Sequence, residues 1–564
     1  MNLEMTIVSS LEKVYKSKEA STLKPLKKLS GLRGETISFQ LDYVLEHDIP
    51  AWGQLSVEGP LAHLLRIRQV ELMPVTRPKD FRADGDYLET EPCAMPDLLK
   101  EADLSFIPLI PGYHRSLWVD VEIPFGQGED TRLQTDDPKD VIPAGTYNME
   151  FTLTPLGEGA CDPCKASIRI EIIDARLPEL TLCHTEWFYG DCIANYYGIE
   201  PMSEAFFRVC RNFIRTAAKR NINTMLTPIF TPALDTAVGG ERRTVQLVDV
   251  TVTGEDTYSF DFKNLERWIR MCLEEGIRFF EMAHLFTQWG CKCAPKILGQ
   301  KEGETVRLFG WETDALSPKY ASFLKQFLPA LKDKLEEMGV LEHTFLHLSD
   351  EPGEKDRDTY EKVNHLVRSI VPGFKILDAM SDVEFYKRGL IDVPACATDH
   401  IGPFLKEMPE NLWAYYCCAQ GRNSANRFMA MPSARNRVLG LQLYRYKLQG
   451  FLHWGYNYYN CMYSYHSIDP YRTVDAEGGV PAGDPFLVYP GRDQVPEESI
   501  RLMVLDEAFN DVRALNLLES LTSYEETVAL ITAPLNFSHY PMEGSFYTEL
   551  REKVNEAIAR HIKR

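Results

Sequence analysis

The 564-residue sequence predicts a multidomain protein with three consecutive parts: an antiparallel β-sandwich, a barrel of alternating strands and helices, and a helical C-terminal extension. Three observations lead to this fold class. Apolar and polar residues alternate over roughly the first 177 residues, eight strand-and-helix units follow, and helical patterns occupy the end of the chain. We place the boundaries of the three parts at residues 1–178, 179–518 and 519–564.

The first part has the period-two pattern of half-buried antiparallel strands. Apolar and polar residues alternate along 117–123, along 147–153 and again along 168–172. Two such sheets close most naturally into a sandwich. Nothing in this part suggests chemistry, so we expect it to play a supporting role.

The second part alternates apolar strand patterns with amphipathic helical ones. We place its eight strands at 182–188, 222–227, 277–284, 344–348, 375–378, 395–398, 412–416 and 450–454. The clearest helical patterns between them are at 203–219, 262–275, 318–338, 360–370 and 435–448. Eight such units predict a (β/α)8 barrel of the TIM type.

Two long insertions interrupt this alternation, at 229–260 and 286–316. In a barrel they would be loops on the face that carries the active site. Beyond the eighth strand, 497–521 has a helical pattern, and we expect the tail to residue 564 to be helical as well.

Composition excludes several classes of function. The formal net charge of -21 argues against binding to nucleic acid or to anionic membranes. No stretch is apolar enough to cross a membrane, and the N-terminus has no secretory pattern, so we expect a cytoplasmic protein. The 13 cysteines suit reduced thiols in apolar surroundings. We expect no metal and no cofactor, and we leave open whether the protein forms a homo-oligomer.

The run 345–352 is the first candidate for chemistry. Mostly apolar residues lead directly into two adjacent carboxylates, Asp350 and Glu351, and a proline then ends the strand. In barrels of this kind catalytic groups stand at the C-terminal ends of the strands. We expect the like charges of the pair to push the two pKa values apart, as acid–base chemistry requires. The alternative is an ordinary acidic helix start.

The other strand ends carry aromatic, acidic and amide side chains, which suit the faces and hydroxyl groups of sugar rings. We take as candidate substrate-binding residues His184, Glu186, Trp187, Asp191, His284, Trp289, Asp378, Trp413, Tyr415, Tyr416, Trp454 and Asn457. Each of them could instead be core or loop packing. There is no glycine-rich phosphate loop, which argues against nucleotide chemistry.

Several stretches carry a resemblance to a known family. Residues 347–352 (HLSDEP), 450–457 (GFLHWGYN) and 483–490 (GDPFLVYP), with 499–511, resemble the catalytic-domain group of glycoside hydrolase family 123, also described as domain of unknown function 4091. The resemblance covers roughly 180–518, and a preceding sandwich is usual in that family.

This resemblance implies carbohydrate metabolism and a retaining β-N-acetylgalactosaminidase-like or hexosaminidase-like enzyme. In the family's reaction the 2-acetamido oxygen of the substrate attacks the anomeric carbon. Mapped onto this sequence, Asp350 would orient the acetamido group, and Glu351 would protonate the leaving oxygen and then activate water. The partner would be a glycan. This scheme is an exception to the use of two separated carboxylates.

Two other functions stay open. A glycosidase acting on a sugar without an acetamido group would need a carboxylate nucleophile on another strand, about 5 Å from its partner, and Asp378 and Glu186 are the candidates. A non-catalytic carbohydrate-binding protein could also use a barrel fold, because fold alone does not confer activity.

Overall fold

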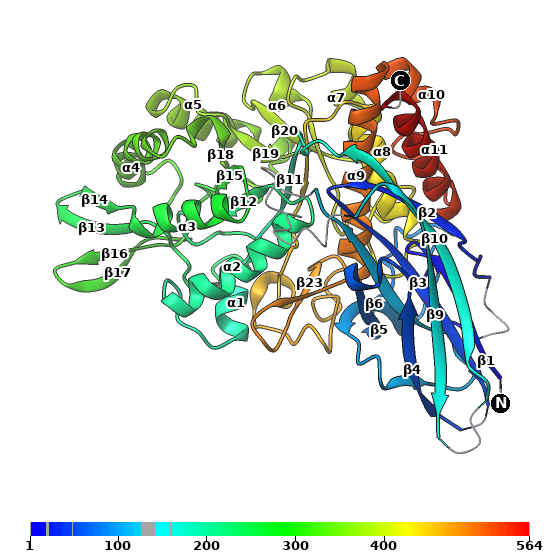
Figure 1. Cartoon of the computed structure of the whole chain (residues 1–564). Helices are drawn as coiled ribbons and strands as arrows, with labels where there is room; N and C mark the ends of the chain where they lie inside the picture. The colour runs from blue at the N-terminus through cyan, green and yellow to red at the C-terminus, as the bar shows by residue number, and fades with distance from the viewer. Residues whose placement is uncertain (1, 18–21, 48, 126–141, 158–160, 563–564) are drawn as a thin grey trace.

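A computed structural model describes residues 2–17, 22–47, 49–125, 142–157 and 161–562. Figure 1 shows the N-terminal sheets on the right, the barrel to their left, and the last helices against both. The architecture is therefore the predicted multidomain combination of β and α/β parts with a helical C-terminus. The exact domain boundaries stay a prediction.

The N-terminal part consists of two five-stranded sheets with a shared apolar core. The first has the order β1 (Asn2–Ser9), β3 (Glu35–Glu46), β8 (Arg115–Ile123), β5 (Leu65–Val75), β6 (Cys93–Glu101). The second has the order β2 (Lys28–Arg33), β10 (Cys164–Arg176), β9 (Gly145–Leu156), β4 (Ala51–Glu58), β7 (Ile107–Leu109). Phe39 and Phe151 meet edge to face between them, with ring centroids 5.8 Å apart. All pairs are antiparallel except β2 with β10, which is parallel.

The first sheet is buried on both faces, which its alternating sequence did not indicate. Asp120 and Arg68 lie on the face turned away from the sandwich core, and both are fully buried. They form an ion pair with each other, and Arg68 also reaches Glu498, 2.6 Å away, in the segment that leads into the helix Ile500–Leu521. The polar face is thus covered by the barrel, and ion pairs satisfy its charges.

The barrel contains eight parallel strands in chain order. They are β11 (Cys183–Glu186), β12 (Thr224–Thr227), β15 (Phe279–Met282), β18 (Thr344–Leu346), β19 (Leu377–Ala379), β20 (Val393–Ala397), β21 (Trp413–Tyr415) and β22 (Gly450–His453). β22 pairs with β11. Between β18 and β19 only the isolated bridge of Leu346 with Ile376 occurs, so the ring is nearly closed. All eight strand positions agree with the prediction, whereas the full TIM-type assignment stays an interpretation.

Helices connect successive strands. They are α1 (Gly190–Tyr196), α2 (Glu204–Lys219), α3 (Lys263–Glu274), α4 (Pro318–Glu337), α5 (Arg357–Ile370), α6 (Glu384–Lys387), α7 (Gly402–Glu407) and α8 (Ala434–Arg445). Ser203 and Ser317 begin α2 and α4, because each hydroxyl accepts a backbone N–H of the first turn. Gly339 follows α4 at a φ of 71°, where glycine is favoured. Short 3-10 turns occur at Ala62–Leu64, Leu341–His343, Glu354–Asp356 and Met462–Ser464.

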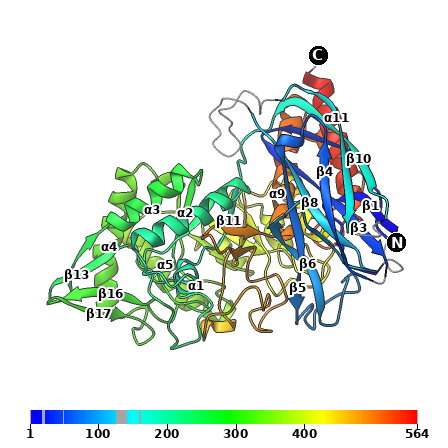
Figure 2. The same ribbon diagram turned by 60° about the horizontal axis from the view of Figure 1, so that its bottom comes forward.

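The two insertions pair with each other. The first forms β13 (Asp249–Gly254) and β14 (Thr257–Asp261), and the second forms β16 (Ile297–Lys301) and β17 (Glu304–Phe309). β13 lies parallel to β16, so the two hairpins make one four-stranded sheet, which projects beside α4 (Figure 2). Tyr258 packs edge to face on Phe323 of α4. The insertions are therefore not only loops: each sends a hairpin away from the strand ends.

The C-terminal part is helical, as predicted. A short hairpin of β23 (Val488–Pro490) and β24 (Pro496–Glu498) precedes α9 (Ile500–Leu521), α10 (Tyr524–Ala529) and α11 (Gly544–Ile562). α9 is buried between the barrel and the first sheet (Figure 1). On α11, Arg551 contacts Glu35 of β3 at 2.6 Å, which ties the end of the chain to the sandwich.

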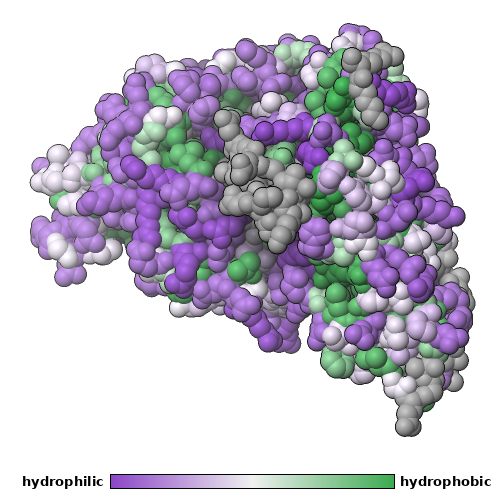
Figure 3. Space-filling model, in the orientation of Figure 1, coloured by the Kyte–Doolittle hydropathy of each residue, from purple (hydrophilic) through white to green (hydrophobic). Residues whose placement is uncertain are grey.

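The surface agrees with the acidic composition. Hydrophilic residues cover most of the face shown in Figure 3, and the apolar areas on it are small and separated. No helix among the described residues has the length and apolar character needed to cross a membrane. The compartment and the oligomeric state stay predictions.

Candidate active site

A pocket of about 840 Å³, its open mouth included, lies at the C-terminal ends of the barrel strands. The described residues that line it are Trp187, Asp235, Trp289, Asp350, Glu351, Ala379, Tyr415, Tyr416, Cys417, Cys418, Leu452, Trp454, Tyr458, Met462, Tyr463, Ala476 and Val480. None of these is a lysine, an arginine or a histidine. The described wall therefore combines carboxyl groups, aromatic rings and neutral donors, which suits an uncharged polar ligand.

Asp350 and Glu351 stand side by side in this pocket, just after β18. The carbonyl of Asp350 accepts the N–H of Trp289 at 2.9 Å, and the N–H of Glu351 donates to the carbonyl of Ala379 at 3.1 Å. Glu351 has a φ of 44°, a left-handed conformation that is unfavourable for a glutamate. Such strain is retained where neighbouring structure enforces it, and it is common at functional sites.

The two carboxyl groups have different surroundings. Glu351 is exposed, and its Oε1 accepts a 2.6 Å hydrogen bond from the hydroxyl of Tyr415. Asp350 is more enclosed. Burial, followed by the charges of Glu351 and Asp235, raises the pKa of Asp350 well above its usual range. Asp350 therefore accepts a proton more readily than an ordinary aspartate.

Asp235 is a third carboxyl group in the pocket, and the sequence analysis missed it. It lies in the first insertion, before the β13–β14 hairpin. Burial raises its pKa to about 6, although Arg242 and the hydroxyl of Tyr189 oppose this change. No local pattern marks Asp235, because its place in the pocket depends on how the whole insertion folds.

Five of the predicted aromatic residues line the pocket: Trp187, Trp289, Tyr415, Tyr416 and Trp454. Their contact with a sugar stays a prediction. Sequence reasoning did not select the other lining residues. The two cysteines directly follow Tyr416 in the chain, and Tyr458 and Tyr463 belong to a tyrosine-rich segment after β22. Their nearness in sequence to selected residues was therefore the one sign that they line the pocket.

Four of the other candidates lie outside the described lining, in buried contacts. Asp191 forms an ion pair with Arg242. Asn457 bonds the backbone of Tyr189 through both its amide oxygen and its amide nitrogen. Trp413 packs edge to face on Phe345. His184 stacks on Phe509, with ring centroids 3.8 Å apart.

Glu186 also lies outside the lining, in a buried polar network below the pocket. Its Oε2 accepts a 2.7 Å bond from Arg427, and its Oε1 lies 3.3 Å from the Nε2 of His184. Arg427 also donates to the Nδ1 of His453 at 2.6 Å. All four side chains are fully buried, so the network supports the floor of the barrel mouth.

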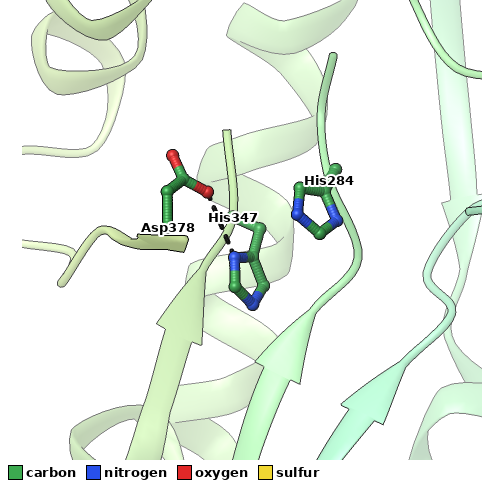
Figure 4. Close-up of side chains that lie close together, drawn as sticks. All are labelled: His284, His347 and Asp378. Carbon is green, nitrogen blue, oxygen red and sulfur yellow. Dashed lines mark hydrogen bonds and ion pairs between the residues drawn. The ribbon is translucent and has the colours of Figure 1, made fainter. Parts of the chain in front are cut away.

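His284, His347 and Asp378 form a second buried cluster below the pocket (Figure 4). Their ligand atoms lie within 4.8 Å of one another, as a metal site would require. However, the oxygens of Asp378 already accept bonds from His347, from the backbone N–H groups of Leu348 and Ser349, and from the hydroxyl of Tyr360. The two imidazole rings are also stacked, with centroids 4.3 Å apart. Asp378 is thus fully engaged in hydrogen bonds, whereas neither ring nitrogen of the buried His284 has a hydrogen-bond partner among the described residues.

His347 is the charged centre of this cluster. Its Nδ1 lies 3.1 Å from Asp378, and its Nε2 lies 3.6 Å from Glu281. Although burial alone would lower the pKa of His347, the two carboxylates raise it to about 9. The same carboxylate of Glu281 accepts the indole N–H of Trp187 at 3.0 Å. The cluster thus connects the segment before Asp350 to one wall of the pocket.

The family model of the glycoside hydrolase 123 catalytic domain matches residues 187–518, which is more than half of the chain. The chain belongs to glycoside hydrolase family 123. The matched range begins at Trp187 in the pocket and ends near the end of α9, so it includes every described lining residue. As a member of this family, the protein is a glycosidase, and its substrate is a glycan.

Solved structures agree with this assignment at the level of the fold. A family 123 glycoside hydrolase from Clostridium perfringens, studied for glycolipid glycan hydrolysis, has a TM-score of 0.72 at 15% identity, over 100% of this chain and 98% of that chain. The sandwich and the C-terminal helices are therefore part of the shared fold. A β-glucuronidase from Bifidobacterium dentium, at 9% identity over 90% of this chain and 67% of its own, has a TM-score of only 0.30. None of the curated proteins matches this family 123 chain.

Proposed function

We propose that this family 123 glycosidase is a retaining β-N-acetylhexosaminidase that favours β-N-acetylgalactosaminides and uses the 2-acetamido group of its substrate. The observation that carries the proposal is the pair Asp350 and Glu351, adjacent in the segment just after β18 and both lining one pocket. Adjacent carboxylates cannot face each other across a glycosidic bond. They can, however, serve neighbouring atoms on one side of the sugar.

The reaction has two steps. In the first, the carboxylate of Asp350 accepts the acetamido N–H, the acetamido oxygen attacks the anomeric carbon, and Glu351 protonates the departing oxygen. In the second, Glu351 takes a proton from water, which attacks the anomeric carbon, opens the cyclic intermediate and restores the acetamido group. Two inversions at this carbon give overall retention. The hydroxyl of Tyr415 holds the Glu351 carboxylate in place between the steps.

The rest of the pocket supports a sugar ligand. Trp187, Trp289 and Trp454 offer ring faces, and the tyrosines offer hydroxyl groups. Small-molecule pockets combine apolar walls with a few placed polar groups in this way. With no cationic side chain in its described wall, the pocket has no evident partner for an anionic sugar.

A glycosidase with its own carboxylate nucleophile is the second candidate. The two residues first considered for that role, Asp378 and Glu186, are fully buried outside the pocket and already bonded to His347 and Arg427. Asp235 is the third carboxyl group that lines the described pocket, and it comes from the first insertion. The position of Asp235 in the pocket is the observation that supports this alternative. Family membership excludes the other alternative, a non-catalytic carbohydrate-binding protein.

Hydrolysis of the p-nitrophenyl β-glycosides of GalNAc, GlcNAc, galactose and glucose tests the proposal, with Asp350→Asn and Glu351→Gln alongside. We expect turnover of the acetamido sugars only, its loss in both variants, and inhibition by a thiazoline analogue of the cyclic intermediate. Turnover of galactose or glucose that the thiazoline does not block would refute substrate assistance and direct attention to Asp235.

A further inference from the structure

Asp235 has a strained backbone that several distant segments hold in place. Its φ is 48°, in the left-handed region. Its N–H donates to the side chain of Gln288 at 2.6 Å, and its carbonyl accepts the hydroxyls of Ser464 at 2.7 Å and Tyr458 at 3.2 Å. Two distant segments of the barrel mouth thus fix one residue, and conformational strain that neighbouring structure enforces is a reason to look for function.

The side chain of Asp235 is also fixed. Its Oδ2 accepts a 3.1 Å bond from the hydroxyl of Tyr189, the residue before α1. Among the described residues, no protein group bonds the other carboxylate oxygen, although the side chain lines the pocket. Arg242, the nearby cation, forms its ion pair with Asp191 instead. One acceptor of Asp235 is therefore left for a ligand.

We propose that Asp235 is a specificity-determining residue that accepts a hydrogen bond from a ring hydroxyl of the sugar whose anomeric carbon faces Asp350 and Glu351. This inference rests on the proposed use of the pocket as the sugar site. A carboxylate accepts hydroxyl hydrogens but cannot donate in return, so it selects for a hydroxyl at one position of the ring. Hydrogen bonds to charged groups are worth about 10- to 100-fold in binding.

A cycle that changes both the residue and the substrate tests this contact. Asp235→Ala and the parent enzyme are assayed on whichever p-nitrophenyl glycoside the parent hydrolyses, and on its 3-, 4- and 6-deoxy forms. We expect Asp235→Ala to lose about 10- to 100-fold in kcat/KM on the full substrate. On one deoxy substrate, and on that one only, the parent and the variant should be nearly equal.

Two other results would overturn the inference. An equal loss on all four substrates would make Asp235 a structural residue, and a trapped glycosyl ester on Asp235 would make it the nucleophile. Asp256→Ala is the matched control, because Asp256 has a φ of 47° in the same insertion but is exposed in the β13–β14 turn. Glu351→Gln, assayed in parallel, tests the proposed function separately, since its retained turnover would count against that proposal alone.

A second observation is independent of Asp235. Cys417 and Cys418 are the only adjacent cysteines in the sequence, both are partly exposed free thiols, and both line the pocket. The backbone of Cys417 is fixed, because its N–H donates to Gln420 and its carbonyl accepts from Asn426, each at 2.9 Å. The neighbouring thiol and burial raise the pKa of Cys417 well above its usual range, so this thiol is neutral.

We also infer that this pair is a binding site for a trivalent arsenical that takes two thiols at once. In the reaction R–As=O + 2 R′SH → R–As(SR′)2 + H2O, two As–S bonds form, both thiol protons leave in water, and nothing is oxidised or reduced. The bound aryl group would occupy the pocket beside Glu351 and Trp454 and exclude the sugar.

Phenylarsine oxide tests this site on the intact enzyme. We expect loss of activity that a dithiol reverses and a monothiol does not, protection by the thiazoline inhibitor, and an adduct mapped to Cys417 and Cys418. Phenylarsine oxide should not change the activity of Cys418→Ser from its value without the reagent. Cys93→Ser, which changes a half-buried cysteine in β6, should be inactivated like the parent. Equal inactivation of Cys418→Ser, or an adduct on Cys161 and Cys164 alone, would overturn the inference.

Discussion

The buried imidazole of His347 allows a sharp test of the electrostatics below the pocket. His347 is fully buried between Asp378 and Glu281, and replacing it with glutamine removes the positive charge but keeps a polar side chain of similar length. Both carboxylates would then be buried without this cation. Removing one partner of a buried ion pair costs about 3–5 kcal/mol of unfolding free energy.

The pH dependence of this cost follows from the pKa of His347, which the fold raises from 6.5 to about 9. At about 1.4 kcal/mol for each pKa unit, the charged imidazole contributes about 3 kcal/mol to stability. Because the folded pKa lies above the unfolded one, this contribution is complete below pH 6.5 and is lost as the pH rises through 9. Lys13, whose pKa burial lowers to about 8, acts in the opposite direction over the alkaline range.

The measurement is therefore a comparison of the parent with His347→Gln, in which the effect of Lys13 cancels. Urea unfolding at about pH 6 and pH 9.5 should show the variant less stable by about 3–5 kcal/mol at the lower pH, and this gap should shrink by about 3 kcal/mol at the higher pH. His365→Gln, an exposed histidine on α5, should show no gap at either pH. A gap of the same size at both pH values would mean that His347 is neutral, and would refute the reasoning.

Three further predictions concern the reaction and the barrel floor. Tyr415→Phe removes the hydroxyl that donates to Glu351 and should lower kcat at least about tenfold; steady-state kinetics with unchanged kcat would contradict this. The carboxylate of Asp350 is lost as the pH drops through its raised pKa, so kcat/KM should begin to fall at a pH well above the pKa of an ordinary aspartate. A pH–rate profile that stays flat down to a pH of about 4 would contradict this. Arg427→Met leaves the buried carboxylate of Glu186 without its cation and should cost about 3–5 kcal/mol in urea unfolding, while exposed Arg208→Met should cost little.

Local patterns were sufficient to predict the eight barrel strands and the position of Asp350 and Glu351. Strand periodicity and the rule that catalytic groups follow strand ends depend on nearby residues alone. The proline did not mark the end of the strand, because β18 ends at Leu346, well before Pro352. Five of the seven aromatic residues that line the described pocket were found by the same rule, whereas Tyr458 and Tyr463 were missed.

Features that depend on distant partners were not predictable in this way. Asp235 reaches the pocket because Gln288 and Ser464 hold it there, and both lie far from it in the chain. Glu186 and Asp378 also follow the strand-end rule, yet Arg427 and His347 bind them below the pocket. The pairing of β13 with β16 likewise joins two insertions that are separated by a helix and a strand.

Asp378 also helps to hold the barrel together between β18 and β19, where the ring is only nearly closed. Only one backbone bridge, Leu346 with Ile376, occurs between these two strands, and the segment after β18 carries Asp350 and Glu351. Immediately beyond that bridge, the N–H groups of Leu348 and Ser349 donate to the carboxylate of Asp378 instead of to a backbone carbonyl. A side chain thus replaces the missing rungs of the ladder. The segments on either side of this gap, one of which leads to Asp350 and Glu351, are therefore joined by one carboxyl group and by the backbone bond from Glu351 to Ala379, where an ordinary sheet would have a continuous ladder.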